Sequence, residues 1–211
     1  LLKRISIMIS SLSEILNDFK MGKFVLITDD EDRENEGDLI IAAEFVQAHH
    51  INFLAKHARG LICLSLTQAQ IEKLKLPLMS SPHHQAGATQ AAFTVSIEAA
   101  HGIRTGISAA DRALTVQVAS NPKAVYTDLI CPGHIFPLRA NDDGVLGRPG
   151  HTEASIDLAR LSGLNPAAVI CEVMNDDGTM ARMSDLVEFS KLHQIKIGTI
   201  SDLIQYRKSH L

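Results

Sequence analysis

The sequence contains few cysteines, and they form no recognisable pattern. Cys63, Cys131 and Cys171 are an odd number, and no CxxC pair occurs. This usage predicts neither a disulfide framework nor a structural zinc site, and it is typical of a reduced, cytoplasmic protein. No apolar run approaches the roughly 18 residues that a membrane-spanning helix requires. The formal net charge of −4 gives no reason to expect nucleic acid or an acidic membrane surface as a partner.

Repeats, low-complexity tracts and linker-like segments are also missing from the 211 residues. Hydrophobic residues make up 45% and charged residues 21% of the chain, which is an ordinary globular composition. Hairpin-like turns, such as the NDDG at 141–144, alternate with segments of helical periodicity. We therefore expect one compact α/β domain over residues 1–211, with a mixed sheet and flanking helices. Because the sequence does not begin with Met, we also expect residues upstream of Leu1.

Periodicity, caps and turn residues place the individual elements. Strands are predicted at 23–28, 39–43, 61–66, 93–97, 169–174 and 195–197. Helices are predicted at 11–20, 49–59, 67–74, from about 108, at 120–129, 152–161, 184–193 and from 201 onward. The helix at 49–59 has Ile51, Leu54, Ala55 and Ala58 on its apolar face. The small residues of 79–92 predict a mobile surface loop.

The most unusual stretch is the acidic segment 29–38, DDEDRENEGD, which holds seven carboxylates and one arginine. It lies between two apolar runs, 24–27 and 39–43. Like charges about 4 Å apart repel by roughly 4 kcal/mol at an effective dielectric near 20, so cations, protons or a metal must compensate them. A solvated acidic loop is the plainest interpretation. However, a carboxylate-rich turn held between two strands is also where a hard divalent ion would bind.

Two specific motifs match the acidic segment poorly. An EF-hand loop would begin at Asp32 and would need a bidentate Glu where the chain has Ala43. A haloacid-dehalogenase-like phosphatase would use Asp30 and Asp32, but it requires Thr or Val where the chain has Glu34. The remaining interpretation is a carboxylate site for a metal and a polyol, in which Arg33 supplies positive charge.

A second candidate is the loop Arg148-Pro149-Gly150-His151-Thr152, which precedes a predicted helix. A helix N-terminus offers free N–H groups, and a nearby Arg can hold phosphate bidentately. Gly150 would let the backbone approach a ligand, and Thr152 would contact an oxyanion. The alternative is that Thr152 is only an N-cap and Arg148 only a surface charge.

Two further residues suit proton transfer. Glu172 interrupts an apolar strand, where burial would raise its pKa, although it could equally lie on a solvated sheet face. His134 lies between two prolines in a segment that predicts a rigid turn, and a histidine in such a place is more often structural than functional. His49, His50, His83 and His84 are expected at the surface, and Cys63 and Cys171 in the core.

Taken together, the motifs resemble one family, 3,4-dihydroxy-2-butanone 4-phosphate synthase of riboflavin biosynthesis. The resemblance rests on the following segments, which cover most of the chain in consistent order: DDEDRENEGDL at 29–39, RGLICLSLT at 59–67, TGISAADRA at 105–113, PGHIFPLRA at 132–140, GVLGRPGHTEASIDLARLSGL at 144–164 and VICEVMNDDGTMAR at 169–182. Pro149 stands where a small residue is expected, which stiffens that loop.

The resemblance implies conversion of D-ribulose 5-phosphate to L-3,4-dihydroxy-2-butanone 4-phosphate and formate. It implies a divalent ion, usually Mg²⁺, with one or two ions per site, and a homodimer with active sites near the subunit interface. Because an imidazole ligand suits Mn²⁺ better than Mg²⁺, either ion is expected to support activity. By resemblance, the metal ligands are Glu34 and His151, and the acid/base pair is His134 and Glu172. Substrate contacts are Arg33, Asp38, Thr105, Arg148, Gly150, Thr152 and Glu172. The chain lacks the length and cysteines of the fused cyclohydrolase form, so it resembles the stand-alone form.

Two other classes remain as alternatives. A metal-dependent sugar-phosphate phosphatase would release inorganic phosphate and would not need His134 or Glu172. A non-catalytic module would bind Ca²⁺ at the acidic segment and would have no use for Arg148 and Thr152.

Overall fold

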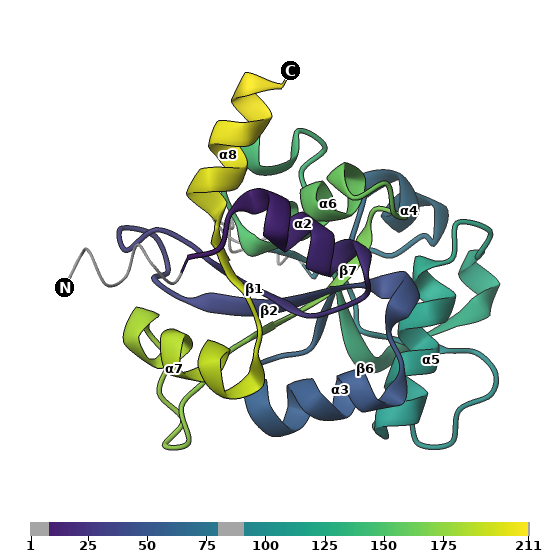
Figure 1. Ribbon diagram of the computed structural model, residues 1–211. Coiled ribbons are helices and arrows are strands. Elements are labelled where there is room, and N and C mark those ends of the chain that lie inside the picture. Colours follow the sequence, from purple (N-terminus) through teal and green to yellow (C-terminus); the bar gives the residue numbers. More distant parts are fainter. Residues whose placement is uncertain (1–8, 80–90, 211) are drawn as a thin grey trace.

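The structure, a computed structural model, describes residues 9–79 and 91–210 (Figure 1). The described strands form one eight-stranded sheet in the order β4-β6-β3-β7-β2-β1-β8, with β5 paired to β6. β1 with β8 and β3 with β6 are parallel, and the other pairs are antiparallel. The predicted mixed α/β sheet is confirmed. The strands are β1 (Val25–Thr28), β2 (Gly37–Ala42), β3 (Cys63–Leu66), β4 (Ala92–Phe93), β5 (Ile97–Ala99), β6 (Leu129–Arg139), β7 (Ala167–Glu172) and β8 (Ile197–Thr199).

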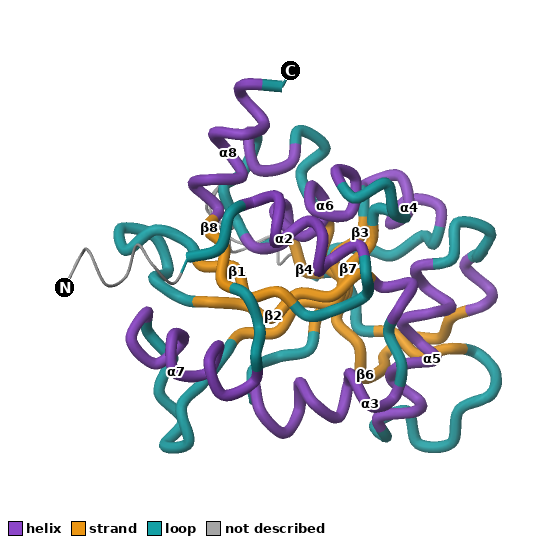
Figure 2. Tube along the Cα trace, viewed as in Figure 1, coloured by secondary structure: helices purple, strands orange, loops and turns teal. Residues whose placement is uncertain are grey.

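Helices cover both faces of this sheet (Figures 1 and 2). The described α-helices are α2 (Leu12–Lys20), α3 (Ala48–Phe53), α4 (Gln68–Lys73), α5 (Ala109–Ser120), α6 (His151–Leu161), α7 (Met183–His193) and α8 (Ile200–Ser209). Short 3-10 turns are η1 (Ala43–Phe45), η3 (Tyr126–Asp128) and η4 (Gly144–Leu146), and η2 (Leu54–Ala58) is a π-helical continuation of α3. None of the described helices is both long and apolar enough to cross a membrane.

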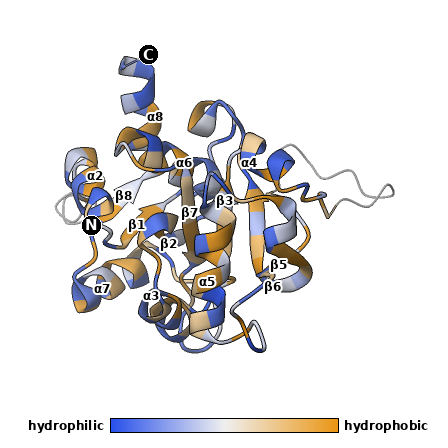
Figure 3. Cartoon of the chain, turned by 90° about the vertical axis from the view of Figure 1, so that its right-hand side faces the viewer, coloured by the Kyte–Doolittle hydropathy of each residue, from blue (hydrophilic) through white to orange (hydrophobic). Residues whose placement is uncertain are grey.

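The core consists of two apolar clusters, one on each face of the sheet, because side chains alternate along each strand. On β2, Leu39 and Ile41 join the cluster that includes residues of α3, α5 and α7. Ile40 and Ala42 point the other way, into the cluster that includes residues of α2, α6 and α8. Figure 3 shows hydrophobic colouring on the strands and on parts of the helices around them. The site described below lies on the α6 face.

Local signals read from the sequence fix several helix starts. Ser11 and Glu14 form a capping box at α2, with the Ser11 amide donating to the Glu14 carboxylate at 3.0 Å. The Thr67 hydroxyl accepts the Gln70 amide at 3.2 Å and begins α4.

The helix predicted at 120–129 is wrong. α5 ends at Ser120, and Asn121 is extended with ψ of 122° because the residue before a proline avoids the helical region. Only the turn η3 follows before β6 begins. The segment 131–139, predicted as a rigid turn, is part of that long strand.

Three smaller predictions also need correction. Ala55 is exposed rather than on the buried face of its helix, since the π-helical turn η2 changes the periodicity there. The strand predicted at 93–97 is split between β4 and β5. The turn at 141–144 leads into η4 and α6 instead of forming a hairpin. The loop predicted at 79–92 lies largely outside the described residues.

Candidate active site

The acidic segment is the loop of the β1–β2 hairpin, in which Thr28 pairs with Gly37. Asp29 organises this loop from inside. Its carboxylate accepts the amides of Glu34 at 2.9 Å and Glu36 at 2.8 Å, and it accepts Arg33 Nη1 at 2.9 Å. The Asp29 side chain is only 1% exposed. The sequence left the role of Asp29 open, and the geometry makes it a structural anchor of the loop.

A second anchor comes from far along the chain. Arg182, which directly precedes α7, donates from Nη1 to the carbonyl of Glu34 at 2.9 Å and to the carbonyl of Asn35. Asn35 has φ of 55°, a left-handed conformation that Asn tolerates better than most residues. Sequence reasoning missed Arg182 as a contributor to the site, although it closes the VICEVMNDDGTMAR motif.

The start of α6 faces the acidic loop. Gly150 is the N-cap, and His151 is the first helical residue. His151 Nδ1 lies 3.8 Å from Glu34 Oε2 and 3.8 Å from Asp38 Oδ1. Within the described part of the chain, His151 Nε2 and Asp38 Oδ1 are buried and have no hydrogen-bond partner. Buried polar atoms are normally satisfied, so these two mark a place where a ligand would fit.

Charges in this cluster perturb one another strongly. The nearby His151 side chain lowers the pKa of Glu34 to about 2, with a contribution from Arg33. Burial, together with nearby Glu172 and Glu34, raises the pKa of Asp38 to about 7. Burial alone would lower the pKa of His151, but Asp38, Glu34 and Asp29 raise it to about 9. A positive charge is therefore stabilised among these carboxylates.

Asp29, Glu34 and His151 offer ligand atoms that lie within 4.8 Å of one another. Both Asp29 oxygens accept hydrogen bonds from the loop, and Glu34 Oε2 accepts Arg33 Nη1 at 2.6 Å, so Glu34 Oε1 and His151 are the better placed donors. Carboxylate oxygens suit Mg²⁺, and an imidazole beside them also suits Mn²⁺. The residues present thus fit a divalent ion at the two positions that the resemblance implied.

Beside this cluster lies a cavity of about 600 Å³, a size typical of small-molecule sites. Its walls come from the acidic loop, the α6 face of the sheet and the start of α6. Seven predicted site residues line it: Arg33, Glu34, Asp38, Arg148, His151, Thr152 and Glu172. Sequence reasoning did not assign the other residues on the wall: Asp32, Glu36, Cys63, Ala91, Phe93, Leu138 and Ile170.

Arg148 is held in the cavity wall by a buried acid. Its Nη1 donates to Glu153 Oε2 at 2.7 Å, and the side chains are 13% and 2% exposed. Glu153 also accepts the Asn141 amide at 3.0 Å. A Cβ at Gly150 would overlap the Arg148 guanidinium, so this glycine makes room for the arginine. Arg148 is therefore not a surface charge.

Thr152 is buried and lies one residue inside the helix, so the interpretation of Thr152 as the N-cap is wrong. Glu172 ends β7, with Asp38 as its register partner on β2. Its Oε2 accepts the Leu61 amide at 2.9 Å, and its side chain faces the cavity rather than a solvated sheet surface.

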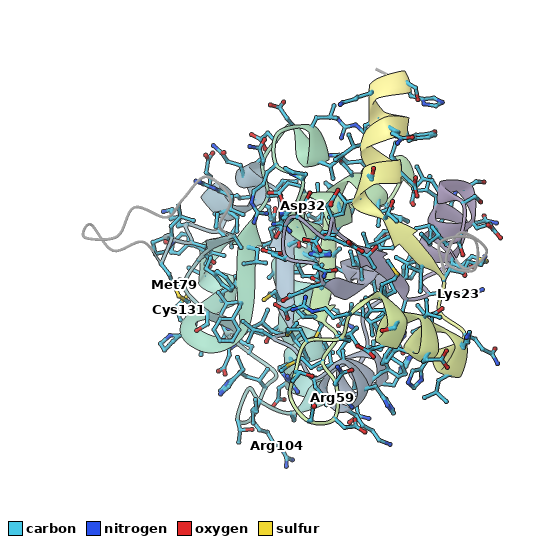
Figure 4. All side chains as sticks on the ribbon, turned by 90° about the vertical axis from the view of Figure 1, so that its left-hand side faces the viewer. Lys23, Asp32, Arg59, Met79, Arg104 and Cys131 are labelled. Carbon is cyan, nitrogen blue, oxygen red and sulfur yellow. The ribbon has the colours of Figure 1, made fainter. Side chains whose placement is uncertain are left out.

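His134 and Thr105 lie outside this cavity. His134 is exposed on β6, four residues before Leu138, which lines the cavity, so it lies roughly 13 Å away along the strand. Thr105 is exposed in the loop before α5. Figure 4 shows Cys131, three residues before His134, well apart from Asp32 of the acidic loop. Within one chain, the predicted site residues therefore form two groups.

The fold and the site define a mixed-sheet α/β protein that joins a carboxylate–histidine cluster to an arginine-bearing helix N-terminus. The family model for 3,4-dihydroxy-2-butanone 4-phosphate synthase matches residues 13–206. The chain belongs to this family, which confirms the resemblance.

Named relatives are similar over nearly the whole chain. A 3,4-dihydroxy-2-butanone 4-phosphate synthase of Neisseria meningitidis serogroup A is 62% identical over 199 residues, covering 94% of this chain and 54% of the relative. The chain thus spans about half the length of the first curated relatives that it matches. One of Haemophilus influenzae is 53% identical over 195 residues, covering 92% of this chain and 90% of the relative.

Solved structures agree. A two-domain 3,4-dihydroxy-2-butanone 4-phosphate synthase from A. baumannii superposes with a TM-score of 0.91 at 53% identity, covering 96% of this chain and 59% of that one. Another 3,4-dihydroxy-2-butanone 4-phosphate synthase, in complex with two magnesium ions, superposes with a TM-score of 0.88 at 40% identity. The match covers 95% of this chain and 98% of that one.

Proposed function

We propose that this chain converts D-ribulose 5-phosphate to L-3,4-dihydroxy-2-butanone 4-phosphate and formate, the activity that its family name denotes. One observation carries the proposal. A single cavity is lined by Arg148 and Thr152, which suit phosphate binding. The carboxylate–histidine cluster and Glu172 line the same cavity. A sugar phosphate needs both features at once, one for its phosphate end and one for its reacting carbons.

The residues of the chain divide the work by position. Arg148 and the first amides of α6 would bind the phosphate, since a helix N-terminus and a guanidinium both attract anions. Arg33 and Asp38 would contact the hydroxyl groups. Glu172, anchored by the Leu61 amide, would take up and return a proton during enolisation and dehydration. The buried walls formed by Ile170 and Leu138 would limit water around the reacting carbons.

Glu34 and His151 would hold a divalent ion, Mg²⁺ or Mn²⁺. Support comes from the unpartnered His151 Nε2 and from the similar structure that binds two magnesium ions. When bound, such an ion would act as a Lewis acid that polarises the substrate carbonyl. We propose one or two ions per site, with Asp38 and Glu36 among the further carboxylates that line the cavity.

A homodimer is also part of the proposal. His134 and Thr105 lie outside the cavity of their own chain, so they would serve catalysis only if they reached the cavity of a second copy. Ile107 and Ile130, close to them in sequence, are 53% and 48% exposed. Apolar residues exposed beside functional ones are typical of a subunit interface. We place this activity in the cytoplasm, where the three cysteines would remain thiols.

The first test is a product assay with D-ribulose 5-phosphate in the presence of Mg²⁺, of Mn²⁺ or of excess EDTA. We expect formate that depends on metal, with no free phosphate. Free phosphate without formate would favour a phosphatase. Neither product from folded, metal-loaded protein would refute catalysis and favour a binding module.

A further inference from the structure

We propose that Glu98 is a positioning residue for His134, fixing which imidazole nitrogen carries the proton and where the other points. The inference rests on the proposed function, in which His134 exchanges protons with the substrate. No role was predicted for Glu98 from the sequence.

His134 lies in a bulge of β6. Along the β5–β6 pair, Ile97 is opposite Ile135, but Glu98 is opposite Ile130. Residues 131–134 therefore have no register partner on β5. A bulge re-aims a side chain away from the regular alternation of its strand, and bulges are common beside active sites. Here the bulge brings His134 over Glu98.

The bulge is held in place by contacts with Ser96 and Ile97, at the start of β5. The Gly133 amide donates to Ser96 Oγ at 3.1 Å. A Cβ on Gly133 would overlap the backbone carbonyl of Ile97, so the two strands are in direct backbone contact there. The residue that precedes His134 is thus held in place, and the histidine has little freedom to leave Glu98.

Glu98 is itself enclosed. Its side chain is 12% exposed, whereas that of His134 is 43% exposed. Its Oε1 contacts His134 Nδ1. On the other side, a Cβ at Gly106 would overlap the Glu98 carboxylate, and Gly106 has φ of +78°, which favours glycine. A largely enclosed carboxylate behind a more exposed imidazole is the arrangement that orients a catalytic histidine.

The contact has a defined chemical consequence. Because an ionised carboxylate can only accept, Nδ1 carries the proton that it donates to Glu98, and the lone pair of the neutral imidazole is on Nε2. The carboxylate then stabilises the imidazolium that forms when Nε2 takes up a proton. Titratable groups near this bulge include Cys131 within it and Asp111 on α5, whose carboxylate accepts the amides of Thr105 at 3.3 Å and Gly106 at 3.1 Å. Glu98 therefore lies between the two predicted site residues that are outside the cavity.

The test compares Glu98→Gln and Glu98→Asp with Glu188→Gln as a matched control. Glu188 is 74% exposed on α7 and pairs with Lys191, away from the site. We expect Glu98→Gln to lower kcat at least about 10-fold with KM nearly unchanged, because loss of the carboxylate that orients a catalytic histidine can lower kcat by up to about 10⁴-fold. The kcat of Glu98→Asp should lie between those of Glu98→Gln and the wild type, because Asp keeps the negative charge but has a shorter side chain. Glu188→Gln should match the wild type.

Nitrogen-15 NMR of His134 gives a readout that does not depend on turnover. In wild-type protein we expect the Nδ1–H tautomer of His134, and in Glu98→Gln a mixture of the two tautomers. An unchanged His134 tautomer or an unchanged kcat in folded Glu98→Gln would overturn the inference. If wild-type protein released no formate, the proposed function would fail, and the NMR comparison would still decide whether Glu98 sets the state of His134.

Discussion

Asp38 and Glu172 are register partners on the antiparallel strands β2 and β7, and both carboxyl groups line the same cavity. Like charges directly opposite each other destabilise a sheet by roughly 0.2–1 kcal/mol. Burial and the neighbouring Glu172 both raise the pKa of Asp38. The pair is thus unfavourable for folding and useful for a site that must attract a cation and exchange protons.

The variant Glu172→Gln should separate the effect of this carboxylate on stability from its effect on catalysis. Gln keeps an oxygen for the Leu61 amide but removes the charge opposite Asp38. We expect formate release to fall at least about 100-fold, as for loss of a general acid/base group. We expect the melting temperature of the metal-free protein to hold or rise by about 1–3 °C. Calorimetry and the formate assay check both, with exposed Glu44→Gln as control. A large fall in melting temperature would contradict this account.

Glu34→Gln and His151→Ala test the metal site. Both variants should fold and should lose metal-dependent formate release. In wild-type protein, Mg²⁺ should raise the melting temperature, because an ion that binds only the folded state stabilises it. That rise should be absent from both variants. Turnover like that of wild type in either one would remove these residues from the ligand set.

Arg148→Ala should raise KM for D-ribulose 5-phosphate more than it lowers kcat, because it removes binding of the unreactive phosphate. The same change leaves buried Glu153 without its arginine, and breaking a buried ion pair costs about 3–5 kcal/mol. The double variant Arg148→Ala with Glu153→Gln should recover much of that stability, but its KM should stay raised. An unchanged KM in the double variant would indicate that phosphate binds elsewhere.

A mixing experiment tests the shared site. His134→Ala and Glu172→Gln should each be inactive alone. When they are unfolded and refolded together, random pairing would give heterodimers in which one of two sites is intact, so activity should recover to about a quarter of wild type. Each variant refolded alone is the control. No recovery from mixtures shown to contain heterodimers would place His134 and Glu172 in the same chain's site.

Asp111 gives a prediction for pH. Burial would raise the pKa of its carboxyl, but hydrogen bonding by Ser108 and by the amides before α5 lowers the pKa below its usual value. A lowered pKa stabilises the fold above the unfolded-state value, about 3.9, and this contribution is lost as the pH falls through the folded-state value. The melting-temperature difference between wild type and Asp111→Asn should be constant from about pH 5 to 8 and should shrink below about pH 4. A constant difference down to pH 2.5 would contradict this.

The sequence predicted the fold well where local rules decide. Ser11, Thr67 and the apolar runs on both sides of the acidic segment each specified an element that the structure contains. The errors arose where tertiary context decides. The long strand β6 contains two prolines, which local rules interpret as a turn, and the π-helical turn at Leu54–Ala58 has no local signature.

The same division holds for the site. The acidic segment and the RPGHT loop were predicted because their composition is unusual over a few residues. Asp29, Arg182 and Glu98 were not assigned roles, because their importance comes from partners distant in sequence or hidden inside the loop. Arg182 contacts a carbonyl 148 residues away, and Glu98 contacts a histidine 36 residues away. No spacing rule applied to a single sequence detects such contacts.

The long strand β6 has a consequence for how this protein can vary. Leu138 at one end of it lines the cavity of its own chain, and in the proposed homodimer His134 would serve the other cavity. The strand β6 would then contribute residues to two catalytic centres. A substitution in the middle of β6 would alter both centres in both subunits at once. Residues 134–138 should therefore tolerate few neutral substitutions.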